Sequence, residues 1–237
     1  MALVMNIGIK EITRGRFGNR ILQYNSLMQM AKELNMKPYC VKWEGHDWFE
    51  NLCETKVPED TGIDVNWDRI INDSYKNLNC NFTVGGYAIH NCYFKLTKMD
   101  PRNFFKVKKE FLPNFDNTIN VGIHIRGGDI LHRNGKVNPD HKRLHHDLEY
   151  YKKAINEVLL DNSNITSIYI CTDDMSYPLV HDVFKYSKSV FNNTKWGTST
   201  NNKNLPHIYD FALLTECDYL ICGSSTYCVT EIGRAHV

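Results

Sequence analysis

The second half of the chain has the clearest pattern of hydrophobic and polar positions. Apolar residues alternate with other residues from Ile119 to Arg126, which predicts a β-strand. Asp147 to Leu160 carries apolar residues at helical spacing, and Ser167 to Cys171 is a short apolar run typical of a buried strand. The elements expected next are a helix near Tyr177–Tyr186, an apolar step at Val190–Phe191, a helix at about His207–Thr215 and a strand at Tyr219–Cys222. Strands alternating with helices predict right-handed βαβ units and a parallel sheet covered on both faces.

The first half begins with the same order of elements. Asn6 to Ile12 predicts a strand, Arg14–Asn19 forms a glycine-containing loop, and helical spacing of apolar residues from Ile21 to Leu34 predicts a helix. We expect Asn35 to end this helix, because Asn tolerates the left-handed backbone conformation. From Trp43 to Lys109 no clean period is present.

Together the two halves predict an α/β protein with two Rossmann-like halves, residues 1–117 and 118–237. The second half is expected to be a parallel doubly wound sheet. Phe111–Asn117, which carries Pro113, is expected to be the crossing between the halves. The Asn-rich segment Asn192–Asn204 is predicted to be a surface loop.

Charge and composition exclude several classes of partner. The 28 Lys and Arg balance 27 Asp and Glu, so no global field selects nucleic acid or an anionic membrane. No apolar run reaches the length of a membrane span, and Met1–Lys10 lacks the pattern of a signal peptide. We expect a cytoplasmic protein, with a luminal (Golgi) catalytic fragment as the alternative. The 8 Cys form no Cys-x-x-Cys pair and are expected to be buried, reduced thiols.

The strand at Ile119–Arg126 places unusual residues on one face. Alternation puts Gly122, His124 and Arg126 on the side opposite the isoleucines and valine. Polar groups at the carboxyl end of a covered strand lie where open α/β sheets bind ligands. The planar guanidinium of Arg126 matches a pair of phosphate oxygens. The alternative is an ordinary ion pair between Arg126 and Asp129 at the sheet edge.

Two further strands end in polar clusters on the same predicted rim. The clusters are Thr172-Asp173-Asp174 and Gly223-Ser224-Ser225-Thr226. The carboxylates suit a guanine edge or ribose hydroxyls, and the Gly-Ser-Ser-Thr turn offers amides and hydroxyls to a phosphate. Asp174, Ser224 and Ser225 could instead cap the helices that follow them.

The loop near the amino terminus is a fourth candidate. Its basic and amide side chains surround Gly15 and Gly18, so its backbone can approach an anion closely. These side chains are Arg14, Arg16, Asn19 and Arg20. The loop is neither a Walker loop nor a dinucleotide fingerprint. The alternative is a tight turn with solvated arginines.

These segments resemble the α1,2-fucosyltransferases and, more widely, the α1,6- and protein O-fucosyltransferases. Gly15–Arg20 resembles their Gly-x-Phe/Leu-Gly-Asn-Gln loop, and Ile21–Tyr24 resembles the Phe-Gln-Tyr that follows in the α1,2 family. His124–Asp129 is similar to the His-x-Arg-Arg-Gly-Asp motif, and Glu149–Ile155 looks like the next helix. Thr172–Asp174 and Ser224–Thr226 fall where the wider family keeps an Asp pair and a Ser-rich turn.

The resemblance implies a GT-B-like pair of Rossmann-like halves, the donor GDP-fucose, a glycan or glycoconjugate acceptor, no required metal and inversion at the sugar carbon. Arg126 would hold the diphosphate, and Asp129 is the candidate base, with a purely structural role as its alternative. The donor-binding residues it implies are Arg16, Gly18, Asn19, His124, Asp173, Asp174, Ser224, Ser225 and Thr226.

Several features depart from the family pattern. Gly127 replaces its second Arg and Arg20 its Gln, so another nucleotide sugar is an alternative donor, and a binding module without catalysis is a third reading. Glu231–Val237 matches one reading frame of a sequencing adapter, so we expect these residues to be non-native and the chain to be a truncated fragment. The spacing of His132, His141, His145 and His146 fits no standard zinc site.

Overall fold

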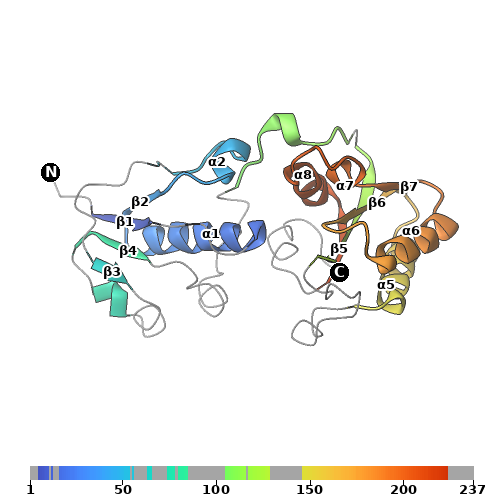
Figure 1. Ribbon diagram of the computed structural model, residues 1–237, viewed down its shortest axis with the longest axis horizontal. Coiled ribbons are helices and arrows are strands. Elements are labelled where there is room, and N and C mark those ends of the chain that lie inside the picture. Colours follow the sequence, from blue (N-terminus) through green and yellow to red (C-terminus); the bar gives the residue numbers. More distant parts are fainter. Residues whose placement is uncertain are drawn as a thin grey trace. The chain divides into compact units, whose positions relative to one another are not determined.

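The computed structural model describes residues 5–10, 12, 16–53, 55, 63–65, 74–77, 80–84, 105–115, 117–128 and 146–223 (Figure 1). The chain divides into two units, 1–108 and 109–237. Each unit contains a four-stranded sheet in which every strand pair is parallel. The predicted α/β class with two Rossmann-like halves is therefore confirmed.

The sheet of the first unit has the order β2-β1-β4-β3. Its strands are β1 (Asn6–Ile9), β2 (Lys37–Cys40), β3 (Ile63–Val65) and β4 (Phe82–Val84). A 3₁₀ helix, η1, spans Ser74–Asn77. The central strand β1 pairs with β2 on one side and with β4 on the other, so the chain changes direction across the sheet beside β1.

Helix α1 (Phe17–Glu33) packs against this sheet and ends in the predicted left-handed cap. Asn35 has a φ of 50°. The Met36 amide donates to the Ala31 carbonyl over 2.8 Å, and the Asn35 amide donates to the Lys32 carbonyl over 3.3 Å. This pair of bonds is a Schellman motif, which satisfies carbonyls that the helix end leaves open.

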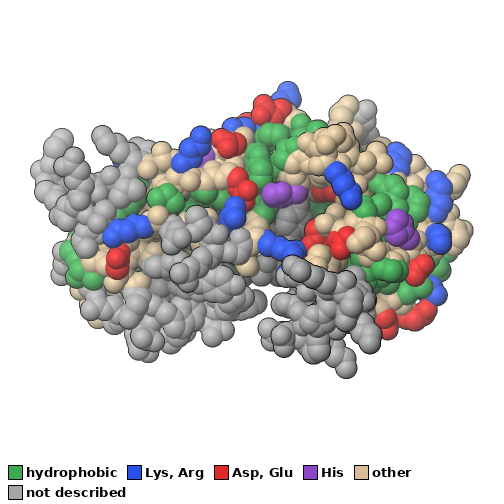
Figure 2. All heavy atoms as spheres, viewed as in Figure 1, with side chains coloured by type: hydrophobic (Ala, Val, Ile, Leu, Met, Phe, Trp, Pro, Cys, Tyr) green, Lys and Arg blue, Asp and Glu red, His purple; other side chains and the backbone are tan. Residues whose placement is uncertain are grey.

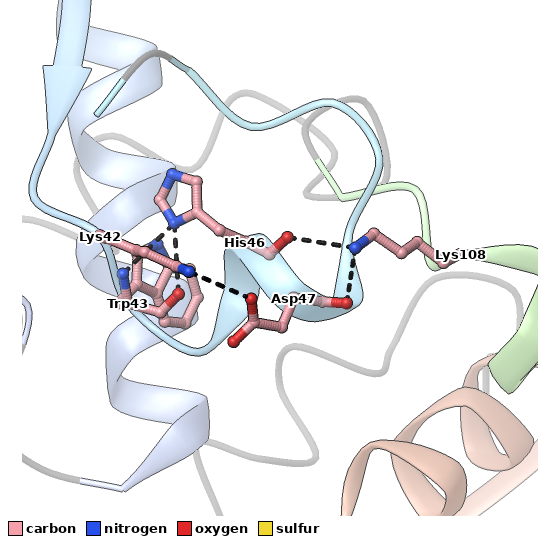
Figure 3. A network of polar contacts seen from close by, with 5 residues as sticks. All are labelled: Lys42, Trp43, His46, Asp47 and Lys108. Atoms are coloured by element: carbon pink, nitrogen blue, oxygen red, sulfur yellow. Dashed lines mark hydrogen bonds and ion pairs between the residues drawn. The ribbon is translucent and has the colours of Figure 1, made fainter. Parts of the chain in front are cut away.

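The short helix α2 (Gly45–Trp48) is held at its carboxyl end by Lys108. The Lys108 ammonium donates to the His46 and Asp47 carbonyls over 3.2 and 2.6 Å (Figure 3). Its backbone amide donates to the Trp48 carbonyl over 2.9 Å. A cation is favourable at a helix C-terminus, where the carbonyls point outward. Lys108 thus fixes the segment after β2 within the first unit.

The sheet of the second unit has the order β7-β6-β5-β8. Its strands are β5 (Ile119–Ile125), β6 (Ile165–Thr172), β7 (Thr194–Trp196) and β8 (Tyr219–Cys222). Its helices are α5 (Leu148–Asp161), α6 (Pro178–Val190), α7 (Thr198–Asn201) and α8 (Ile208–Glu216), preceded by the 3₁₀ helix η3 (Lys109–Phe111).

The prediction of a surface loop at Asn192–Asn204 was wrong. That segment contains β7 and α7. The Gly197 amide donates to the Ile170 carbonyl over 2.8 Å, so contacts with β6 rather than a hydrophobic pattern fix this part of the chain. The apolar step at Val190–Phe191 belongs to the end of α6 and its cap.

The two faces of the second sheet are covered as the alternation in β5 predicts. Helices α5 and α6 pack on one face and α8 on the other (Figure 1). Val121, Ile123 and Ile125 lie in the core beneath α5 and α6. On the opposite face Gly122 lies so close to α8 that a Cβ would be 2.7 Å from Leu214 Cδ2. The absence of a side chain at Gly122 therefore lets α8 pack directly on β5.

The described surface carries charges of both signs. On the face in Figure 2, acidic and basic side chains are interspersed, in keeping with the net charge of +1. None of the helices in the described ranges is both long and apolar enough to cross a bilayer.

Candidate functional site

The carboxyl end of β5 lies at a topological switch point. The chain passes from β5 outward through β6 to β7 and then returns to β8 on the other side of β5. His124 pairs in register with Cys171 on β6 and with Cys222 on β8. Open α/β sheets bind ligands outside the carboxyl ends of their strands at such a point. The residues that follow β5, beginning with Arg126, therefore occupy the ligand-binding rim of this fold.

His124 is a buried imidazole in this rim, with 6% of its surface exposed. Burial lowers its pKa to about 4, and the nearby Arg126 guanidinium acts in the same direction. The Asp173 carboxylate acts in the opposite direction but does not outweigh burial. His124 is thus neutral at pH 7, and His124, Arg126 and Asp173 interact electrostatically as a group.

Asp173 organises the backbone that follows β5. Its Oδ1 accepts hydrogen bonds from the Gly127 amide over 2.7 Å and from the Gly128 amide over 3.3 Å. A carboxylate that accepts two backbone amides fixes the path of the backbone that carries them, here the residues directly after β5. Asp173 therefore helps to define the position of Arg126.

Asp174 has a different environment from its neighbour. Its Oδ1 accepts the Ser176 amide over 2.9 Å and the Ser176 hydroxyl over 2.6 Å, while its own amide donates to the Thr172 hydroxyl over 3.1 Å. These bonds form the turn between β6 and α6. Asp174 therefore shapes this turn and does not cap α6, whose N-cap residue is Tyr177 and receives no side-chain cap bond.

Gly127 departs from the resembling motif because a side chain has no room there. A Cβ on Gly127 would lie 2.9 Å from Asp174 Cβ and 3.2 Å from Tyr177 Cβ. Both neighbours are stem atoms close to the backbone, so neither can rotate away. The close approach of the β5 end to the start of α6 therefore requires glycine at this position.

The sequence did not predict a buried hydrogen-bond network that holds the end of β6, next to the rim. The Asp210 carboxylate accepts the Ser199 amide over 2.7 Å, the Thr200 amide over 2.9 Å and the Thr200 hydroxyl over 2.6 Å. The Thr172 amide in turn donates to the Thr200 hydroxyl over 2.9 Å. Asp210 thereby links α8 to the end of β6, next to Asp173. An acidic residue within the otherwise apolar Ile208–Leu214 run is the sequence signal that could have identified it.

A second feature not foreseen lies at the end of β8. The rings of His146 and Tyr150 contact in a tilted arrangement with centroids 4.3 Å apart, and the Tyr150 hydroxyl donates to the Cys222 carbonyl over 2.8 Å. A Cβ on Gly223 would lie 2.8 Å from His146 Cδ2. The start of α5 therefore packs on the same rim as His124, from the β8 side of the switch point.

The candidates in the first unit lie at the start of α1. Arg16 is the exposed N-cap residue, Gly18 is buried, and Asn19 is half-buried in the first turn. Among the described residues, no side chain caps this end and the first turn carries no acidic group. Its amides are therefore suited to an anion. Arg20, which stands where the resembling motif has Gln, forms an ion pair with Glu44 over 2.7 Å.

Some predicted residues lie outside the described part of the chain. These are Arg14, Gly15, Asp129, Ser224, Ser225, Thr226 and the segment 231–237. Within the described part, no cluster of three or more His, Cys, Asp or Glu side chains could hold a metal ion.

Similar solved structures agree with this architecture. No protein-family model and no curated protein sequence matches the chain. NodZ alpha-1,6-fucosyltransferase crystallised with GDP is similar with a TM-score of 0.56 at 11% identity, over 99% of this chain and 93% of the other. A mutant of Arabidopsis thaliana FUT1 in complex with GDP is similar with a TM-score of 0.57 at 10% identity, over 98% of this chain and 68% of the other. The apo form of POFUT1 is similar with a TM-score of 0.53 at 10% identity, over 96% and 93% of the chains.

The sheets and the switch-point rim define an α/β protein with two Rossmann-like units, of GT-B-like architecture. Across nearly its whole length, the chain has a fucosyltransferase-like fold.

Proposed function

We propose that this protein is a glycosyltransferase that transfers fucose from GDP-fucose to a glycan hydroxyl, with inversion at the sugar carbon. The observation that carries the proposal is the position of Arg126 directly after β5, at the switch point beside neutral His124. NodZ, one of the proteins with the same fold, has been soaked with GDP-fucose and crystallised with GDP. The sequence motifs around Gly18 and Arg126 resemble those of the α1,2 enzymes, which makes an α1,2 linkage the first to test.

Arg126 is assigned to the diphosphate. When a nucleoside diphosphate leaves a sugar, negative charge grows on its phosphate oxygens and an oxocarbenium-like centre forms at the sugar carbon. A guanidinium fixed in advance stabilises that charge without reorganisation in the transition state. The backbone bonds from Gly127 and Gly128 to Asp173 supply this fixation, because they define the turn that carries Arg126.

His124 is assigned a neutral role beside the nucleotide. Its low pKa keeps the imidazole uncharged at neutral pH, so it can donate a hydrogen bond but adds no second full charge to the site. The proton of the acceptor hydroxyl needs a base, and Asp129 remains our candidate for it. No step in this scheme requires a metal ion, because the guanidinium supplies the positive charge at the leaving group.

Calorimetry with GDP, UDP, GDP-fucose and UDP-glucose tests the donor site. The variants are Arg126→Ala, Arg126→Lys and, as a matched loss of positive charge, Lys153→Ala on α5, whose side chain is 80% exposed. A charge-assisted bond to phosphate contributes about 1.5 to 3 kcal/mol, so Arg126→Ala should weaken GDP binding by about tenfold or more. Lys153→Ala should bind as the unaltered protein does. Arg126→Lys should bind with intermediate affinity, because it retains the charge but loses the planar fork.

The pattern of binding separates the proposal from its alternatives. Tighter binding of UDP than of GDP would overturn the choice of donor and favour a transferase for another nucleotide sugar. Selective GDP binding without GDP release from GDP-fucose, over a panel of glycan acceptors, would instead favour a binding module. Binding of none of the four compounds by the folded protein would contradict the transferase assignment.

A further inference from the structure

Two cysteine side chains touch in the first unit, at the carboxyl end of β2. Cys40 is the last residue of β2, and Cys53 follows α2. Both are free thiols, and their Sγ atoms lie 3.5 Å apart. A disulfide bond is about 2.05 Å long, so the sulfur atoms need to approach by only about 1.5 Å.

The backbone around Cys53 is held next to Cys40 by several contacts. The Cys53 amide donates to the Tyr24 hydroxyl of α1 over 2.6 Å. His46 Nε2 lies 3.3 Å from the Cys53 carbonyl oxygen and 3.8 Å from Cys40 Sγ. Lys108 anchors α2, which carries His46 (Figure 3). Contacts with Tyr24 of α1 and with His46 of α2 therefore hold the Cys53 backbone next to Cys40.

The two thiols differ in accessibility and in acidity. Cys40 is buried, whereas Cys53 is half-buried and can meet a small molecule from solvent. The hydrogen bond between the two thiols lowers the pKa of Cys53, and the same bond together with burial raises the pKa of Cys40. Since the thiolate is the attacking form, Cys53 is the thiol that reacts first.

We propose that Cys40 and Cys53 form a site of reversible disulfide formation whose oxidant is a low-molecular-weight disulfide such as oxidised glutathione. The Cys53 thiolate attacks one sulfur of the oxidant, forms a mixed disulfide and releases one glutathione thiolate, which takes up a proton. Cys40 then attacks the Cys53 sulfur and displaces the second glutathione thiolate. The two cysteines lose two electrons, and the oxidant is reduced to two thiols.

His46 is positioned to stabilise Cys40 in the second step. Its Nδ1 accepts the Trp43 amide over 3.3 Å, which places the ring proton on Nε2 (Figure 3). The Nε2–H lies 3.3 Å from the Cys53 carbonyl oxygen and 3.8 Å from Cys40 Sγ. As Cys40 attacks, this N–H favours its thiolate form, and the Cys40 proton passes through solvent to the departing glutathione thiolate.

The covalent link would tie the segment that carries α2 to the carboxyl end of β2. The same segment bonds to Tyr24 of α1, the helix whose first turn carries Gly18 and Asn19. Closing a loop of this length restricts the unfolded chain, so oxidation should raise the melting temperature by roughly 5 to 10 °C. Reduction should reverse the change.

Peptide mapping of the full chain provides the test. The protein is equilibrated in buffers from fully reduced to fully oxidised glutathione, quenched with acid, alkylated after unfolding and digested without reduction. We expect one peptide pair linked through Cys40 and Cys53 that increases with oxidised glutathione, together with the rise in melting temperature. In the time course a glutathione adduct on Cys53 should precede the link.

Single variants separate the two steps. Cys40→Ser should accumulate glutathione on Cys53, and Cys53→Ser should leave Cys40 reduced. Cys217→Ser, at a buried thiol of the second unit, should leave the link unchanged. Cys40 and Cys53 that stay alkylatable at every ratio in the folded unaltered protein, or a link from Cys53 to any other cysteine, would overturn the proposal. The time course of the unaltered protein decides the question even if a variant fails to fold.

Discussion

The Thr200 hydroxyl donates a hydrogen bond to the Asp210 carboxylate over 2.6 Å, and both side chains are buried. The same hydroxyl accepts the Thr172 amide. This chain of bonds runs from α8 through α7 to the end of β6, one residue before Asp173. The position of the rim thus depends on a carboxylate that does not belong to it.

Asp210→Asn should lower the free energy of unfolding of the second unit by about 1 to 3 kcal/mol. Asn keeps one accepting oxygen and replaces the other with an NH2 group that cannot accept, so at least one of the three donors that Asp210 now serves loses its partner. GDP affinity should fall as well, because the end of β6 loses its support. Urea unfolding and calorimetry measure the two effects.

Asp182→Asn is the matched control for this prediction. Asp182 lies exposed on α6, so the same chemical change there should alter stability by no more than about 0.5 kcal/mol. Equal stability of Asp210→Asn and Asp182→Asn would show that the network is dispensable.

His124 should make the protein less stable in mild acid. Burial lowers its folded pKa from 6.5 to about 4, so between these values the unfolded chain binds a proton that the folded chain does not. The contribution of neutral His124 to the free energy of unfolding is therefore complete above pH 6.5 and is lost as the pH falls toward 4. Between pH 7.5 and 5 the loss should be about 2 kcal/mol.

Urea unfolding of the unaltered protein and His124→Asn at both pH values isolates this contribution. The variant should lose about 2 kcal/mol less than the unaltered protein on acidification. Parallel losses in the two proteins would mean that His124 titrates normally in the folded state.

Gly127→Ala should be destabilising by about 1 to 3 kcal/mol, because the new methyl group would overpack against Asp174 and Tyr177. Gly223→Ala is the comparison, since its Cβ would meet the His146 ring, which ends a flexible side chain. We expect the smaller cost at Gly223. Thermal unfolding of both variants measures the two losses of stability. Equal losses would contradict the close packing inferred at Gly127.

Asn35 offers a matched pair of substitutions at the end of α1. With a φ of 50°, Asn35→Gly should preserve or slightly raise stability. Asn35→Ala should lower it by about 1 kcal/mol, because a Cβ without a local hydrogen-bonding group is strained in this region. Denaturant unfolding of the first unit should rank the proteins Gly, Asn, Ala, and the reverse order would exclude a left-handed cap.

Local patterns predicted much of the second unit. Alternation gave the two faces of β5, and the apolar run of β8 ends at Cys222 as expected. These elements are continuous in sequence and bury complete hydrophobic faces, so the pattern contains the information. The same holds for the cap at Asn35, where one residue type satisfies one backbone requirement.

The parts that escaped prediction depend on contacts between distant segments. β7 and α7 are short and polar, and bonds to Ile170 and Asp210 hold them in place. For the same reason the sequence did not show that Asp173 and Asp174 have different hydrogen-bond partners. Only the tertiary structure brings Asp173 to the Gly127 and Gly128 amides, while Asp174 turns toward Ser176.

The switch point also has a consequence for the order of folding. The Asn120 amide of β5 donates to the Asp218 carboxylate beside β8 over 2.9 Å, across 98 residues of sequence. Contacts this distant form late, because the entropy of closing the intervening chain opposes them until β6 and β7 have docked. We therefore expect the rim around His124 to acquire its geometry in the last step of folding of the second unit.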